Sequence, residues 1–345
     1  MSIIIYYDSE QEGKWFQSLS KDLIGARLVK LARRGNNPGP IDQLLRYDRP
    51  DIIVTLHGVP KLVLEKTSEV PTGHNVTQRF GRLANAMEEN VMAVYFLPFD
   101  AMKHGLYSNR CKISARLFIA LDKMENIHGV PALAVEWPSD KNQELIRDGS
   151  EDESLRKLVD KLAVSNFNLD SAASEISQIK AHMQSTFEKR LKEEPATAKF
   201  PNSVELIETR EFVNRVKKIS AGLVSKLPPH IFKRNHTVVY ELGMTPEKSR
   251  REDPYVGTQF LYDYMGCRNG PNPSDKFNNL VLSVSKVPRE VWETYNPNDP
   301  SRKSSLYYAT ADLIVLKDDV IVCESKISHD TYNRVNSSLE EYFRA

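Results

Sequence analysis

The 345-residue sequence has few cysteines, little net charge and no long apolar run. Its three cysteines, Cys111, Cys267 and Cys323, lie far apart and form no C-x-x-C pair. Neither a disulfide framework nor a zinc knuckle is expected, and a reducing compartment is favoured. No apolar stretch approaches the length of a membrane span, and Ile3–Tyr7 is too short for a secretory signal. We therefore expect a cytoplasmic protein without a membrane segment.

The balance of charges excludes a generally basic surface. The net charge is +1, so contact with nucleic acid would have to come from local basic patches. Nucleotide-binding and hydrolase motifs are also missing: there is no Walker loop, no G-x-G-x-x-G after a strand and no G-x-S-x-G. None of the eight histidines has the spacing of a zinc site.

A β-hairpin is predicted near the end of the chain, where two apolar, β-branched runs flank the polar break Lys317–Asp319. Asp312 opens the first strand. Glu324 and Lys326 stand two apart on the second strand and so share a face. Two carboxylates can hold Mg²⁺, and a lysine can orient or deprotonate a water that attacks a phosphodiester. The alternative is a surface hairpin whose Glu and Lys pair in solvent.

A similar hairpin is predicted earlier, from Asp51 to Thr67, with a turn over His57-Gly58-Val59-Pro60. It begins with a Pro50-Asp51 pair and carries Glu65-Lys66-Thr67 on its second strand. Strand alternation puts Thr67 on the face of Glu65 and Lys66 on the other, unless a bulge turns Lys66 inward.

An apolar helical stripe starts eleven residues after each glutamate, at Val76 and at Val335. A common fold or an internal duplication would produce this agreement, and so would chance.

Asp312, eleven residues and then Glu-x-Lys resembles the signature of the PD-(D/E)XK nuclease superfamily, which includes many restriction endonucleases. The Pro50-Asp51 pair strengthens the resemblance, whereas Thr67 departs from it at the lysine position. The resemblance implies an α-β-β-β-α-β core like that of restriction endonucleases. Catalytic residues would be Asp312, Glu324, Lys326, Asp51, Glu65 and Lys66, and the four acids among them would bind Mg²⁺.

Three regions are expected: an α/β nuclease-like domain over residues 1–148, a helical segment over 149–228 and a nuclease-like α+β module over 229–345. The helical stripe of the second region includes Val204, Ile207 and Phe212. The third region stops before the last strand of the superfamily core, which leaves open whether it is complete.

The expected function is a Mg²⁺-dependent endonuclease that cuts double-stranded DNA, as in a type II restriction system. Two sites would let one chain cut both strands; a single site would require a homodimer. Polar residues in loops and on one helix could reach phosphates or base edges. These candidates for DNA binding are Arg33, Arg34, Gln78, Arg79, Arg82, Lys233, Arg234, Arg250, Arg251 and Arg268. The alternative function is a non-catalytic DNA-binding or assembly protein on a nuclease-like scaffold.

Overall fold

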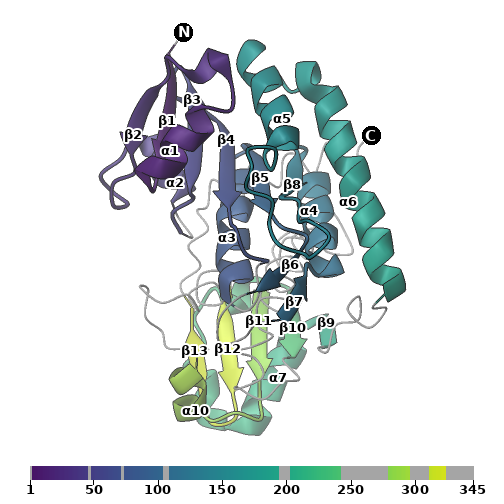
Figure 1. Cartoon of the computed structure of the whole chain (residues 1–345). Coiled ribbons are helices and arrows are strands. Elements are labelled where there is room, and N and C mark those ends of the chain that lie inside the picture. The colour runs from purple at the N-terminus through teal and green to yellow at the C-terminus, as the bar shows by residue number, and fades with distance from the viewer. Residues whose placement is uncertain are drawn as a thin grey trace. The chain divides into compact units, whose positions relative to one another are not determined.

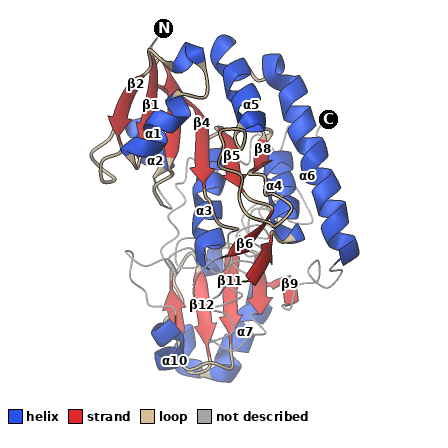
Figure 2. Cartoon of the chain, in the orientation of Figure 1, coloured by secondary structure: helices blue, strands red, loops and turns tan. Residues whose placement is uncertain are grey.

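The computed structural model describes residues 2–45, 48–70, 74–103, 109–193, 203–241, 279–295 and 311–323. The chain divides into two compact units. The first comprises Met1–Pro71 with Arg79–Ala198, and the second comprises Thr72–Gln78 with Lys199–Ala345. Helices and strands alternate in both (Figures 1 and 2), which makes this a mixed α/β protein.

A six-stranded mixed sheet forms the centre of the first unit, in the order β2-β1-β3-β4-β5-β8. Its strands are β1 (Ile3–Tyr7), β2 (Arg27–Lys30), β3 (Ile52–Leu56), β4 (Val59–Lys66), β5 (Met92–Leu97) and β8 (Ala132–Glu136). β3 runs antiparallel to both β1 and β4, while β4, β5 and β8 are parallel to one another. Every residue of β5 is buried, as expected for a strand with parallel neighbours on both sides.

The predicted hairpin at residues 51–67 is confirmed as β3 and β4, but its turn is shorter than predicted, because Val59 and Pro60 already belong to β4. His57 and Gly58 have φ of 52° and 81°, the left-handed pair that a tight two-residue hairpin turn requires. The strand register shifts at Val54 and Thr55, opposite Pro60. Proline lacks an N–H for the ladder, so an irregularity is the expected place for it.

Helices cover the sheet of the first unit. They are α1 (Glu10–Gln17), α2 (Gly39–Leu44), α3 (His74–Glu88), α4 (Ala115–His128), α5 (Glu153–Val164) and α6 (Ala173–Glu193), with single 3₁₀ turns at Lys21–Leu23 and Asp170–Ala172. The part of α3 before Arg79 belongs to the second unit. α6 packs against β8, α4 and α5. A short hairpin of β6 (Asp100–Lys103) and β7 (Asn109–Lys112), which was not predicted, forms a separate two-stranded sheet.

The second unit is built on a five-stranded mixed sheet in the order β13-β12-β11-β10-β9. Its strands are β9 (Ser203–Glu208), β10 (His236–Glu241), β11 (Asn279–Val284), β12 (Leu313–Leu316) and β13 (Val320–Val322). β10, β11 and β12 are parallel, and β9 and β13 run antiparallel to them. The helices are α7 (Thr209–Ile219), α8 (Ala221–Val224), a 3₁₀ turn η4 (Ile231–Lys233) and α10 (Arg289–Tyr295).

The predicted helical segment 149–228 differs from the structure in two ways. The helical stripe predicted from Val204 is wrong before residue 209, because Ser203–Glu208 forms β9 and pairs with β10; cross-strand pairing outweighs the apparent helical spacing of Val204 and Ile207. The expected helical segment 149–228 is shared between the units, with α5 and α6 in the first and α7 in the second.

The late hairpin is present as β12 and β13, but its place in the sheet differs from that of the early one. β12 pairs in parallel with β11, whereas β3 pairs antiparallel with β1. Over the described residues, β13 pairs only with β12, whereas β4 has β5 as a second partner. The two hairpins are therefore not equivalent elements of a repeat in the part of the chain described. The expected helix from Val335 lies outside that part.

Within the described ranges, no helix is long and apolar enough to cross a bilayer.

Candidate functional site

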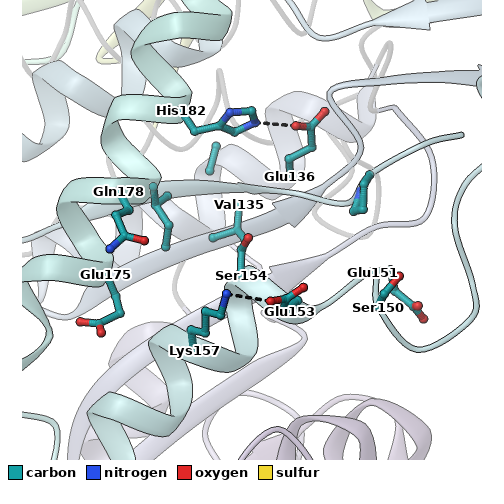
Figure 3. Close-up of a pocket in the computed structure, with 13 residues that line it drawn as sticks. Val135, Glu136, Ser150, Glu151, Glu153, Ser154, Lys157, Glu175, Gln178 and His182 are labelled. Carbon is teal, nitrogen blue, oxygen red and sulfur yellow. Dashed lines mark hydrogen bonds and ion pairs between the residues drawn. The ribbon is translucent and has the colours of Figure 1, made fainter. Parts of the chain in front are cut away.

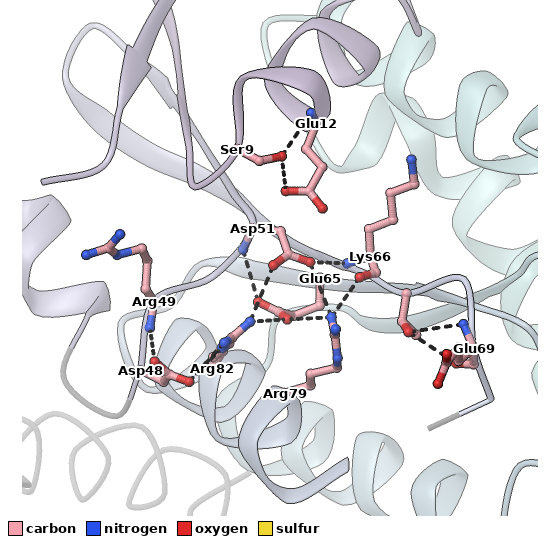
Figure 4. Close-up of polar contacts among 11 residues, drawn as sticks. Ser9, Glu12, Asp48, Arg49, Asp51, Glu65, Lys66, Glu69, Arg79 and Arg82 are labelled. Carbon is pink, nitrogen blue, oxygen red and sulfur yellow. Dashed lines mark hydrogen bonds and ion pairs between the residues drawn. The ribbon is translucent and has the colours of Figure 1, made fainter. Parts of the chain in front are cut away.

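The β3–β4 hairpin brings two carboxylates together. Asp51 immediately precedes β3, and Glu65 lies near the end of β4, directly opposite it. The backbone N–H of Asp51 donates to Glu65 Oε1 at 3.1 Å. Asp51 is 7% exposed and Glu65 is completely buried. The fold therefore places these two acids side by side (Figure 4).

Two arginines on α3 face this carboxylate pair. Arg79 and Arg82 stand three apart, so they project from the same side of the helix. Arg82 Nη1 donates to Glu65 Oε2 at 2.8 Å and to Asp51 Oδ1 at 3.4 Å. Its Nε and Nη2 both donate to Asp48 Oδ2, at 3.1 and 2.9 Å. Arg82 therefore bonds to the buried carboxylate pair and to Asp48 at the same time.

Arg79 occupies a point on which three oxygens converge. Its Nη1 lies 2.7 Å from the backbone carbonyl oxygen of Lys66 and 3.4 Å from both Asp51 Oδ2 and Glu65 Oε2. Two carboxylates and a carbonyl are hard oxygen donors of the kind that Mg²⁺ prefers. The guanidinium nitrogen therefore marks a position where the surrounding atoms suit a cation.

Burial dominates the electrostatics of the pair. Together with the neighbouring Asp51 carboxylate, it raises the pKa of Glu65 to about 8, and Arg82 and Arg79 offset only part of this. Burial also raises the pKa of Asp51, against the lowering effect of the Lys66 N–H, which donates to Asp51 Oδ2 at 2.7 Å. Without a divalent cation, the pair therefore holds a proton readily near neutral pH.

Lys66 points to the opposite side of β4 from Glu65, as strand alternation predicts. Its Nζ lies 3.7 Å from the centre of the Trp15 ring and 5.4 Å from that of Trp137. Phe96 is stacked between the two indoles, with centroid distances of 5.7 and 5.2 Å. Burial lowers the pKa of Lys66, against the carboxylates of Glu12 and Asp152.

The hydroxyl of Thr67, which was expected to share the face of Glu65, donates to the carbonyl of Glu69 and accepts from its N–H. These bonds form a local turn after β4. Thr67 makes no described hydrogen bond to the carboxylate pair.

Besides Asp48, a further carboxylate near the pair was not predicted from the sequence. Glu12 on α1 is half-buried, and burial and then the Asp51 charge raise the pKa of its carboxyl group. Ser9 caps α1 by accepting from the Glu12 N–H at 3.3 Å and donates to Glu12 Oε2 at 2.8 Å. The Ser-x-x-Glu spacing is a capping signal readable from sequence. The proximity of the Glu12 carboxylate to Asp51 depends on the packing of α1 against the sheet, which the spacing does not reveal.

The candidate residues of the late hairpin have a different environment. Asp312 is 2% exposed and accepts from Arg234 Nη1 at 2.9 Å and from the Leu280 N–H at 2.8 Å. Its other oxygen lies 3.3 Å from His230 Nε2. Asp312 is therefore held in a buried ion pair that ties β12 to its neighbours. Glu324 and Lys326 lie outside the described residues.

The DNA-binding candidates divide into three groups. Arg33, Arg34 and Lys233 are exposed. Arg79, Arg82 and Arg234 are engaged with carboxylates, so they are not free to bind phosphate in this conformation. Arg250, Arg251, Arg268 and the side chain of Gln78 lie outside the described part of the chain.

A cavity of about 430 Å³ lies elsewhere in the first unit, between β8, α5 and α6 (Figure 3). His182 Nε2 lies 2.5 Å from Glu136 Oε2 on its wall, and this contact raises the pKa of His182. Glu151, Glu153 and Glu175 add further carboxylates, and Lys157 pairs with Glu153 at 2.7 Å. The cavity is acidic and contains none of the residues predicted for catalysis.

No group of three or more His, Cys, Asp or Glu side chains suited to a metal ion occurs among the described residues. The oxygen set around Arg79 differs from such a group, because its third member is a backbone carbonyl. No protein family model, curated protein or solved structure matches this chain.

Proposed function

We propose that the chain is a Mg²⁺-dependent DNA endonuclease similar to type II restriction enzymes, with its site at the β3–β4 hairpin. The observation that carries the proposal is the convergence of Asp51 Oδ2, Glu65 Oε2 and the Lys66 carbonyl on one cation position. An oxygen triad suits Mg²⁺, and the two carboxylates would neutralise its charge.

The strand arrangement around the site supports the same proposal. β1, β3 and β4 are antiparallel neighbours in the sheet, although α1, β2 and α2 separate β1 from β3 in the chain. After β4, α3 leads to β5, which is parallel to β4. The consecutive part β3-β4-α3-β5 is similar to the β-β-α-β part of the core implied by the resemblance to PD-(D/E)XK nucleases. Asp51 and Glu65 lie on the hairpin that carries the acids in that pattern.

Each side chain has a distinct role in the proposed reaction. Asp51, Glu65 and the Lys66 carbonyl would hold Mg²⁺, which when bound acidifies water and offsets the charge of the phosphate. The Lys66 ammonium, held on the Trp15 ring, would contribute positive charge beside Asp51. Glu12 would accept a proton from water on that side of the sheet.

The arginines favour a second function, in which the nuclease-like scaffold binds DNA or a partner without cleaving. Arg79 and Arg82 each contact both acids, so positive charge already lies beside the pair without a metal. For Mg²⁺ to bind as proposed, Arg79 must leave its position.

Cleavage of supercoiled plasmid with Mg²⁺, with and without EDTA, separates the two functions. We expect chelator-sensitive cleavage that Asp51→Asn reduces on the order of a hundredfold or more, since even partners of metal ligands contribute 10–100-fold. Asp100→Asn is the control, because Asp100 also pairs with two arginines, Arg110 and Arg190, but lies outside the site. Equal cleavage by the parent and Asp51→Asn would exclude this site, and a folded protein that never cleaves would favour the second function.

A further inference from the structure

A hollow of about 540 Å³ opens in the second unit beside the start of α7 and the 3₁₀ turn η4. Phe232 lines it and is 52% exposed, whereas the adjacent Ile231 is completely buried. Among the exposed large apolar side chains of the described residues, Phe232 is the only aromatic one. Exposing a phenyl ring at a concave site is unfavourable in water, so a flat apolar ligand would gain by covering it.

Several polar side chains around the ring of Phe232 are not engaged with other described residues. Arg210, Asn214 and Asn235 line the same hollow, and their side chains make no hydrogen bond or ion pair with any described residue. Lys233, next to Phe232, is exposed and equally unengaged within the described ranges. Arg234 also lines the hollow but is committed to Asp312.

This combination of an aromatic ring, amide groups and positive charges suits the bases and phosphates of nucleic acid. An exposed aromatic ring stacks on a nucleobase of any sequence, and an asparagine amide offers both a donor and an acceptor to a base edge. Arg210 and Lys233 supply charges for phosphate. Glu208, the acid on the rim, disfavours phosphate at its own end and can accept from an exocyclic amine.

We propose that this hollow binds single-stranded nucleic acid, with one unpaired base stacked on Phe232 and adjacent phosphates at Arg210 and Lys233. A base within a duplex has both faces covered, so Phe232 selects unpaired bases. The inference rests on the proposed function for the choice of a polynucleotide and goes beyond it: the second unit would hold an unpaired segment, such as a strand end or a junction, in addition to the duplex cut at the β3–β4 site.

The test is equilibrium filter binding of an end-labelled 12-nucleotide oligothymidylate to the full-length protein in EDTA, where metal-dependent cleavage does not occur. Phe232→Ala should weaken binding about tenfold or more, the size of one lost base–aromatic stack. Phe232→Trp should retain or tighten binding. Ile219→Ala, which removes an exposed apolar side chain outside the hollow, should bind like the parent.

Salt provides a second readout. Two phosphate contacts to a single strand predict a slope of log K against log salt of about −1.4, and Arg210→Gln or Lys233→Gln should each reduce its magnitude by about 0.7. Circular dichroism of each variant checks that the fold is intact, and the Phe232→Trp result keeps the test valid if Phe232→Ala unfolds.

Several results would overturn the proposal: binding unchanged in a folded Phe232→Ala, competition by blunt duplex as strong as by the oligonucleotide, or competition by thymidine monophosphate as strong as by the strand. The last would indicate a site for a free nucleotide. If Phe232→Ala weakens binding while the parent never cleaves with Mg²⁺, only the endonuclease proposal fails. If the parent cleaves and Phe232→Ala binds normally, only this proposal fails.

Discussion

Arg79 is the residue on which the two candidate functions differ most. Its Nη1 sits among the three oxygens proposed for Mg²⁺, and its side chain is 25% exposed, compared with 13% for Arg82. Arg82 is also tied to Asp48, whereas the described polar contacts of Arg79 all go to the oxygen triad. Arg79 is therefore the side chain best placed to exchange with a metal.

Removing Arg79 should strengthen Mg²⁺ binding. Arg79→Ala deletes a positive charge that competes for the same oxygens, and we expect affinity to rise roughly tenfold, equivalent to about 1.4 kcal/mol. Isothermal titration with Mg²⁺ measures this directly. Arg110→Ala, which removes an arginine paired with Asp100, is the matched control and should leave the affinity unchanged. A weaker affinity in Arg79→Ala would mean that the arginine helps to hold the site together instead of blocking it.

The buried Glu65 predicts a pH dependence of stability. Its pKa is about 8 in the folded chain against an ordinary value of 4.5, so between these values the folded state keeps a proton that the unfolded chain has released. The free energy of unfolding must therefore contain a contribution that is present at low pH and lost as the pH rises through this window.

Glu65→Gln removes that contribution. In EDTA, the stability of the parent relative to Glu65→Gln should decline from about pH 5 to pH 8 and then level off, as measured by chemical denaturation. The exposed Glu153→Gln should show no such trend over the same range. A difference independent of pH would show that Glu65 is ionised throughout.

At the scale of elements, the two-residue turn between β3 and β4 sets the register that brings Asp51 opposite Glu65. Gly58 has φ of 81°, where a residue with a Cβ is strained by about 1–2 kcal/mol. Gly58→Ala should lower the free energy of unfolding by about that amount and weaken Mg²⁺ binding. Gly25→Ala is the control, because its added Cβ meets open space without an unfavourable φ. A hairpin that keeps its stability in Gly58→Ala would show that the turn adapts without strain.

Sequence patterns predicted the elements whose signal is local. The β3–β4 hairpin, α3 and the β12–β13 hairpin all follow from apolar runs, alternation and turn residues. For β9 the sequence predicts a helix, because Val204 and Ile207 fit a helical spacing. The strand forms through pairing with β10, which is distant in sequence. The β6–β7 hairpin has short, polar strands that carry no periodicity.

The candidate site could be predicted in part for the same reason. Asp51, Glu65 and the outward direction of Lys66 follow from the hairpin alone. The contacts of Arg79 and Arg82 with both acids, and the approach of Glu12 to Asp51, depend on how α3 and α1 pack against the sheet. No local spacing contains that information. For Asp312, burial beside Arg234 likewise arises from strands distant in sequence.

At the scale of the whole molecule, only the first hairpin has both of its predicted acids among the described residues, because Glu324 of the late hairpin lies outside them. If this pair is the only site of the proposed endonuclease, one chain would cut one strand per binding event, and nicked plasmid should accumulate before linear product. Conversion of nicked to linear plasmid should accelerate with protein concentration if a second protomer cuts the other strand. Asp312→Asn should leave the nicking rate unchanged while destabilising the second unit by about 3 kcal/mol, since it breaks a buried pair. Loss of cutting in a folded Asp312→Asn would instead assign the late hairpin a catalytic role.

The stacked rings beneath Lys66 have a practical consequence. The chain has three tryptophans, and two of them, Trp15 and Trp137, sandwich Phe96 beside the proposed site. The third, Trp292, is completely buried in the second unit. Tryptophan fluorescence can therefore report on each unit separately, without an added label. After Trp292→Phe, the remaining indole emission reports only on the surroundings of Lys66, and the difference from the parent reports on the second unit alone.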